Sequence, residues 1–340
     1  MDIKTNIRTA FRIGILGIAT ASAIPLHAQI RAGGAMEFVD VATDTRLVAS
    51  GGLHATGVSG TPSQMFHNPA LIADSIVGAI DMSISPVGGG IKYASGSYVI
   101  GTKTGIGTFT GGIQYAGYGE FTRTDEDGYE IGTFRANEVA LYASVSRSMS
   151  PRLTLGATIK PMLSTMDTDH AFALAMDFGA SITGCDNRLT AALVIRNAGA
   201  VVKKYSDDDK HMNLPLDIKV GMTYKAEHAP FRFVLTAKDL LHPDLSVKKG
   251  KKLNIGDNIL RHTLMGIEFV PVRAFYFAIG YDQRKRRELT DQDAGGLAGI
   301  SWGCGLKVRK FEVKYAHSRY HVAGSQNSIT ISSNIRNFKK

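Results

Sequence analysis

Two β-strands can be read in LDIKVGMTYKAEHAPFRFVLTAKDL, the stretch from Leu216 to Leu240. Every second residue from Leu216 to Tyr224 is apolar, and the residues between them are polar, charged or glycine. After a break at residues 227–230, the alternation resumes as far as Leu235. A period of two is typical of strands, because successive side chains point to opposite faces. The stretch therefore predicts two strands, each with one apolar face and one polar face.

Two surroundings suit strands of this kind. In a soluble protein the apolar face packs on a core and the polar face meets water. In a transmembrane β-barrel the apolar face meets lipid and the polar face meets the lumen. Two strands alone do not distinguish these cases, so the number of strands and the lengths of their connections have to decide.

The alternation recurs through most of the 340-residue chain. It predicts fourteen strands, an even number, and most of them have the roughly 10 residues that a tilted strand needs to cross a bilayer. The strands are predicted at residues 78–85, 91–101, 105–117, 133–148, 153–164, 171–183, 189–198, 216–226, 230–240, 261–270, 274–283, 296–307, 310–319 and 325–336.

Charged residues within these strands indicate which face meets the lumen. A lysine that faced lipid near the midplane would cost roughly 2–4 kcal/mol. The charged strand residues are therefore predicted to point into the lumen: Lys160, Lys219, Lys225, Lys238, Glu268 and Glu312.

The predicted connections alternate in length. Every second one is short, such as SMSPR and AEHAP. The others are mostly longer, at residues 118–132, 165–170, 199–215, 241–260 and 284–295. Short periplasmic turns alternating with long external loops are typical of outer-membrane barrels. We therefore predict an all-β fold: a transmembrane antiparallel β-barrel of about 14 strands, with both barrel termini in the periplasm and the long loops outside the cell. A large soluble β-protein is the remaining alternative.

The first residues, 1–28, are predicted to be a secretory signal peptide. Lys4, Arg8 and Arg12 make a basic start, and residues 13–26 form a short apolar stretch. This order of a basic start, an apolar stretch and small residues before a cut is typical of such signals. A mitochondrial presequence is the competing interpretation, because the segment carries arginine and little acid.

Residues 29–77 precede the first predicted strand. They are too apolar for a disordered tail. A fourteen-stranded lumen is wider than side chains alone can fill. We therefore predict that this segment lies inside the barrel as a plug, or hatch, and that residues 78–340 form the barrel.

No set of residues in the chain has the spacing of a catalytic, cofactor or metal site. The triplet KTG at Lys103–Gly105 and SVKK at Ser246–Lys249 contain the pieces of a serine acyl-enzyme motif, but in the reverse order. The ten histidines have no ligand spacing, and two cysteines do not form a disulfide framework. We therefore predict a protein without enzymatic activity and without a cofactor.

Two basic runs lie in predicted external loops of a chain whose formal net charge is +9. The simpler interpretation is that both are solvated loops. The alternative is contact with a protein partner or with anionic lipopolysaccharide. Nucleic acid is not expected as a partner of a secreted barrel. The candidate contact residues are Lys248, Lys249, Lys251, Lys252, Arg284, Lys285, Arg286 and Arg287.

Several longer stretches resemble one family of outer-membrane proteins. They include RAGGAMEFVDVATDTRLVASGG, FHNPALI, GGIQYAGYGEFTRTDEDGYEIGTF and AALVIRNAGAVVKKY. On these stretches the chain resembles the PorQ family, which belongs to the PorV/PorQ group of the type IX secretion system and is related in fold to the FadL fatty-acid transporters. The hatch motif of that fold matches Asn68, Pro69 and Ala70.

The resemblance implies a function as a non-enzymatic anchor. PorQ-like proteins are expected to hold a surface protein, PorZ. PorZ joins PorU and PorV in an attachment complex that processes secreted cargo and links it to anionic lipopolysaccharide. The alternative function is a FadL-type outer-membrane channel for a hydrophobic compound, which would need an apolar pocket near the plug.

Overall fold

The computed structural model describes most of the chain after the predicted signal peptide. The described residues are 35–57, 60–101, 106–184, 186–206, 212–243, 245, 254–289, 298–321 and 324–338. The predicted signal peptide, residues 1–28, lies outside this part.

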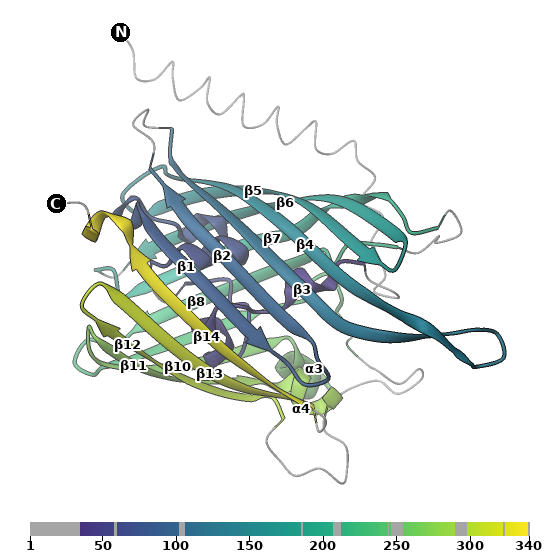
Figure 1. Cartoon of the computed structure of the whole chain (residues 1–340). Helices are drawn as coiled ribbons and strands as arrows, with labels where there is room; N and C mark the ends of the chain where they lie inside the picture. The colour runs from purple at the N-terminus through teal and green to yellow at the C-terminus, as the bar shows by residue number, and fades with distance from the viewer. Residues whose placement is uncertain are drawn as a thin grey trace. The chain divides into compact units, whose positions relative to one another are not determined.

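Fourteen antiparallel strands close into a barrel (Figure 1), which confirms the predicted fold class. Each strand pairs with its neighbours in the sequence, and β1 closes the barrel by pairing with β14, Ala79 opposite Asn334. The strands are β1 (Ala79–Pro86), β2 (Lys92–Ile100), β3 (Thr108–Thr124), β4 (Glu130–Ser148), β5 (Leu153–Met166), β6 (Asp169–Gly184), β7 (Leu189–Lys203), β8 (Asp217–Lys225), β9 (Phe231–Ala237), β10 (Thr263–Val272), β11 (Phe275–Asp282), β12 (Ile300–Val308), β13 (Phe311–His321) and β14 (Gly324–Asn334).

The two faces of the barrel wall differ as the alternation predicts. On β8, Val220 and Met222 are 46% and 44% exposed, whereas Lys219 and Thr223 are 5% and 6% exposed. The inward residues are buried by the contents of the lumen, and the outward apolar residues form the surface that meets lipid. No helix in the described part of the chain is long and apolar enough to span a membrane.

Two predicted long loops are instead extensions of hairpins. The loop predicted at 118–132 is wrong, because β3 and β4 stay paired as far as Thr124 opposite Glu130. The loop predicted at 165–170 is wrong in the same way, since β5 and β6 remain paired up to their tight turn. Beyond the bilayer a paired ribbon needs its backbone hydrogen bonds but no apolar face, so the alternation ends before the strand does.

Two other predicted loops contain short helices. Helix α3 (Ile255–Arg261) lies in the β9–β10 connection, and α4 (Gln283–Leu289) follows β11 directly. The basic run at Arg284 is therefore helical and not a loop, which corrects the prediction. Asp282 explains the difference, because its Oδ1 accepts the backbone N–H groups of Arg284 (3.0 Å) and Lys285 (3.3 Å) and so starts the helix.

The segment before β1 lies within the ring of strands (Figure 1) and is made of short helical turns. Its elements are η1 (Glu37–Asp40), α2 (Thr45–Ala49), η2 (Pro62–Phe66), η3 (Pro69–Leu71) and η4 (Asp74–Ile76). Helix α2 contacts β11 to β14, η2 contacts β1 to β4, and η3 contacts β4 to β6. One segment thus touches walls on different sides of the lumen. We call residues 35–78 the lumen segment.

Candidate functional site

The lumen segment is held by buried polar contacts that begin at Asp44. This residue caps α2, because its Oδ1 accepts the backbone N–H groups of Arg46 (2.8 Å) and Leu47 (3.2 Å). Its other oxygen accepts from Ser63 Oγ at 2.7 Å and lies 3.7 Å from Lys314 Nζ on β13. Burial raises the pKa of Asp44, but Lys314 and these hydrogen bonds outweigh it and keep the pKa below its usual value. Asp44 is therefore a carboxylate that joins α2, η2 and the wall.

Arg46 makes the most completely paired contact between the lumen segment and the barrel. Its Nε and Nη2 donate to the two oxygens of Glu268 on β10, each at 2.8 Å. Glu268 also accepts from Arg232 on β9 at 3.1 Å, and its side chain is fully buried. The guanidinium of Arg46 lies 4.2 Å from the ring centre of Tyr276, a cation–π geometry. A single carboxylate thus lies between two arginines, one from the segment and one from the wall.

A second group of charges fixes the other side of the segment. Arg196 on β7 donates to Asp40 Oδ1 at 2.7 Å and to the backbone oxygens of Val39 (2.9 Å) and Phe66 (3.1 Å). Its side chain is fully buried. Lys160 and Asp177 pair beside it at 2.7 Å, and both side chains are also fully buried. Buried charges of this kind are costly unless they are paired, so these contacts specify one position for the segment.

The predicted hatch motif lies against β4 to β6. Asn68 donates through Nδ2 to the carbonyl of Ala55 (2.7 Å) and accepts the N–H of Ala70 through Oδ1 (3.0 Å). Two wall glycines let the motif approach the sheet. A Cβ at Gly179 would stand 2.0 Å from Asn68 Oδ1, and one at Gly156 would stand 2.5 Å from the Pro69 carbonyl carbon. The motif is therefore one of the places where the segment packs directly on the wall.

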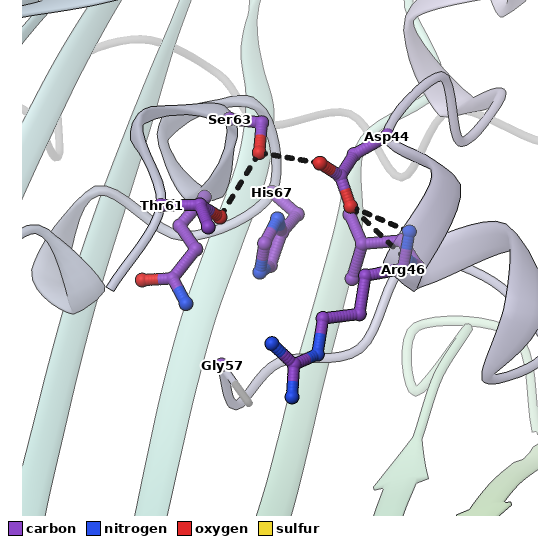
Figure 2. A pocket seen from close by; sticks show the side chains of 8 residues that line it. Asp44, Arg46, Gly57, Thr61, Ser63 and His67 are labelled. Atoms are coloured by element: carbon purple, nitrogen blue, oxygen red, sulfur yellow. Dashed lines mark hydrogen bonds between the residues drawn. The ribbon is translucent and has the colours of Figure 1, made fainter. Parts of the chain in front are cut away.

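A small polar cavity separates α2 from η2 (Figure 2). Figure 2 shows His67 lying between Ser63 and Arg46. It also shows the hydrogen bond from Ser63 to Asp44 and the one between the Ser63 and Thr61 hydroxyls. The cavity leaves ≈ 10 Å³ for the centre of a water molecule, about the room that one water needs. Neither ring nitrogen of His67 has a hydrogen-bond partner. A single water is the occupant that fits this space.

Both histidines of the segment are held neutral. Burial, together with the nearby charge of Arg196, lowers the pKa of His67 to about 3. Burial also lowers the pKa of His54 to about 4, although the Ser50 carbonyl, 2.8 Å from Nε2, opposes this shift. At neutral pH neither imidazole adds charge to the lumen.

A larger cavity lies where β9 begins and β10 ends. Its volume is ≈ 340 Å³, and its lining combines apolar with basic residues. A bulge in β10 between Phe269 and Val272, at Pro271, interrupts the pairing there, because proline has no N–H for the ladder. The lining residues are Lys225, Ala229, Pro230, Phe231, Arg232, Val270, Pro271, Val272 and Arg273.

The contacts described above join the lumen segment to the wall. Across the described residues no three His, Cys, Asp or Glu side chains gather closely enough to hold a metal ion. Ser63, a hydroxyl that lines the polar cavity with His67, has its single O–H directed to carboxylates, Asp44 Oδ2 at 2.7 Å or Asp81 Oδ2 at 2.9 Å. The histidine is therefore not placed as the base of a nucleophile.

The predicted basic contact residues fall in two different places. Lys248, Lys249, Lys251 and Lys252 lie outside the described residues. Arg284, Lys285, Arg286 and Arg287 belong to α4, which contacts α3, β10 and β13. Arg284 pairs with Asp239 at 2.7 Å, and Arg287 pairs with Asp257 at 3.3 Å. The hatch motif contacts η2 and β4 to β6, so the two candidate sites are separate.

Arg46, Asp44 and Arg196 were not among the sequence-predicted site residues. Arg46 and Glu268 are 222 positions apart, and only the closed barrel brings them together. One signal does exist: Glu37, Asp40, Asp44 and Arg46 are charged residues in a stretch with many apolar residues, and charges that enter a barrel need partners.

Comparison with known proteins bears on the fold. No protein-family model matches the chain. No curated protein sequence matches it either. Among solved structures, the toluene transporter TodX of Pseudomonas putida matches with a TM-score of 0.51 and 12% identity, over 86% of this chain and 97% of TodX. The monoaromatic hydrocarbon channel CymD matches with a TM-score of 0.47 and 11% identity, over 85% of this chain and 97% of CymD.

The chain shares the barrel fold of TodX. At 12% identity the likeness to TodX concerns the fold alone. The more specific resemblance to the PorQ family remains a prediction.

Proposed function

We propose that the protein is a closed outer-membrane barrel that holds a protein partner at the membrane surface and does not pass solutes through its lumen. The observation that carries this proposal is the set of buried ion pairs between the lumen segment and three parts of the wall. Arg46 reaches Glu268 on β10, Asp40 reaches Arg196 on β7, and Asp44 reaches Lys314 on β13. A segment that is paired with the wall on several sides should stay in place and keep the lumen closed.

The energetic cost of opening supports this proposal. Breaking a buried pair by removing one partner costs about 3–5 kcal/mol. Moving the lumen segment aside would separate all three pairs at once and expose the apolar residues that pack around Phe38 and Phe66. Passage along the lumen would therefore need a much larger conformational change than a side-chain rotation.

The surface for such a partner is proposed at the end that carries the long connections. The β3–β4 hairpin projects beyond the neighbouring strands at one end of the barrel (Figure 1). Helices α3 and α4 lie at the same end. Tyr129 at the hairpin turn is 72% exposed. The resemblance to the PorQ family suggests a PorZ-like partner and, through it, the PorU and PorV attachment complex. It also suggests that this end faces outside the cell.

The test is capture of the partner from solubilised outer membranes. Affinity-tagged wild-type protein should retain a surface protein in stoichiometric amount. Replacing residues 121–134 with an Asn-Gly turn removes the hairpin extension and should reduce the retained amount. Glu227→Ala, at the short-turn end, is the control and should retain it fully. Purification of the barrel with no protein partner would contradict the anchoring role.

A channel for a small hydrophobic compound is the second candidate, and the structural comparison favours it more than the anchor. TodX is a toluene transporter and shares this fold. The cavity of ≈ 340 Å³ beside Pro271 is within the range of about 300–1,000 Å³ that small-molecule sites have. The apolar residues around Phe38 inside the barrel would then form part of the path once the lumen segment moved.

Uptake by proteoliposomes tests this candidate directly. Vesicles that contain the wild-type protein should take up radiolabelled toluene no faster than empty vesicles if the barrel is closed. Saturable uptake above that background would establish the channel and would overturn the closed-barrel proposal.

A further inference from the structure

Helix α3 exposes a strongly apolar face at the end of the barrel that carries the long connections. Ile255 is 78% exposed, Ile259 is 61% exposed and Leu260 is 41% exposed. Leu240 and Leu241, in the same connection between β9 and β10, are 43% and 42% exposed. Contiguous apolar surface of this kind marks contact with a protein or a membrane.

The apolar face of α3 continues the lipid-facing surface of β10. Ile255 and Ile259 are four residues apart and so share one face of the helix. Thr263, the first residue of β10, follows on that face, and its Oγ1 donates to the carbonyl of Ile259 at 2.9 Å. From Thr263 onward the outward positions are Met265 and Ile267, which are 37% and 49% exposed.

Leu240, which precedes α3 in the same connection, also adjoins the lipid-facing surface, at β8. The backbone N–H of Leu240 donates to the carbonyl of Ile218 at 3.4 Å, which places Leu240 at the edge of β8. The outward residues of β8 below it include Val220, which is 46% exposed. The patch on α3 and on Leu240 is therefore continuous with an interface that already meets lipid.

The opposite face of α3 is polar and already occupied. Asp257 accepts from Arg261 (3.1 Å) on its own helix and from Gln283 (3.2 Å) on α4, and it pairs with Arg287 at 3.3 Å. Because the polar face binds α4, the apolar face is the one turned away from the protein. A helix of this kind suits the boundary between head groups and acyl chains.

Charge on the two helices indicates which lipids they favour. Helices α3 and α4 together contain five basic and two acidic residues. The surplus is carried mostly by α4, which packs on the polar face of α3. Positive charge next to an inserted apolar face favours lipids with anionic head groups.

We propose that α3 is an interfacial helix that inserts Ile255 and Ile259 into the leaflet at this end of the barrel, near lipids with phosphate-bearing anionic head groups that α4 attracts. This contact is independent of the proposed function, since it applies to an anchor and to a channel alike. A protein partner on the same patch is the competing occupant.

Quenching of tryptophan by brominated phospholipids tests this proposal. Trp302 is the single tryptophan of the chain, so the Trp302→Phe variant provides a background without tryptophan. Ile259→Trp and Ile255→Trp are then introduced separately. After refolding into pure lipid vesicles, brominated lipid should quench both, and their emission should be blue-shifted. Because the vesicles contain no other protein, a patch reserved for a partner would remain in water.

Two control positions calibrate the result. Phe233→Trp, on the lipid-facing side of β9, should be strongly quenched, and Tyr129→Trp, at the hairpin turn, should not. Emission of Ile259→Trp and Ile255→Trp that matches Tyr129→Trp would overturn the proposal and favour a protein partner. Brominated phosphatidylglycerol should quench Ile259→Trp more than an equal fraction of brominated phosphatidylcholine. Equal quenching by the two would overturn the head-group preference.

Discussion

Glu268 should be the most sensitive single position for retention of the lumen segment. The change Glu268→Gln keeps the size of the side chain and removes the charge that faces both Arg46 and Arg232. Arg46→Met removes only one guanidinium and leaves Glu268 paired with Arg232. We therefore expect Glu268→Gln to be the more damaging of the two.

The magnitude follows from burial. The Glu268 side chain is 0% exposed, and those of Arg46 and Arg232 are 11% and 19% exposed, so solvent replaces little of the lost interaction. Loss of one partner of a buried pair costs about 3–5 kcal/mol, and Glu268→Gln should be in that range. The pair Arg135–Glu120 on the β3–β4 hairpin is 74% and 48% exposed. Glu120→Gln is the matched control and should cost at most about 1 kcal/mol.

Reversible urea unfolding of the refolded protein in vesicles measures these free energies. Limited proteolysis reports in parallel whether the lumen segment has left the barrel while the strands remain intact. The reasoning would be refuted if Glu268→Gln were no more destabilising than Glu120→Gln, or if Arg46→Met were the worse of the two.

Three other outcomes are expected. Gly179→Ala places a Cβ 2.0 Å from Asn68 Oδ1 and should cost about 1–3 kcal/mol by overpacking, whereas Gly184→Ala meets nothing within 4 Å and should be neutral in the same urea titration. His67 has a pKa of about 3 in the fold against 6.5 when free, so only the unfolded state gains its proton as the pH falls below about 6.5. Stability should fall by up to about 1.4 kcal/mol per pH unit towards pH 3, and the pH 7 to pH 5 difference should shrink in His67→Gln; an unchanged difference would show that His67 does not cause it. Val220→Lys puts an ammonium on the lipid face and should reduce heat-modifiable protein in the outer membrane, whereas Ile131→Lys, on the hairpin extension, should assemble normally; equal yields would contradict the assigned faces.

The barrel could be predicted from the sequence because the bilayer imposes a regular constraint on every strand. Stretches such as Leu216–Tyr224 must present apolar residues at alternate positions, and this period remains visible without any tertiary information. The ends of the strands were harder to predict from the sequence. On the β3–β4 hairpin the constraint ends with the bilayer, so Glu120 and Thr122 resemble loop residues although they are paired.

The interior of the barrel could be predicted only in part. The apolar character of residues 29–77 predicts a plug, whereas the ion pairs of the lumen segment depend on barrel closure and strand register. Arg232 lies opposite Glu268 because β9 and β10 are neighbours of fixed register. Arg46 then reaches Glu268 from α2, 222 positions away in the sequence, and no local pattern encodes either contact. The sequence did not predict α3 for another reason. The helix has only seven residues, and one of them is Gly256. So short a helix shows no clear helical period in the sequence.

A disulfide between the lumen segment and the wall tests the central claim most directly. Thr45 Oγ1 on α2 and Thr330 Oγ1 on β14 are 2.7 Å apart, so Thr45→Cys with Thr330→Cys should cross-link them once Cys185 and Cys304 are replaced by serine. If the barrel works with its lumen closed, the oxidised variant should retain as much surface partner as the wild type, and reduction should change nothing. Loss of activity on oxidation and its recovery on reduction, measured as partner retention or as toluene uptake, would show that the lumen segment has to move and would contradict the account.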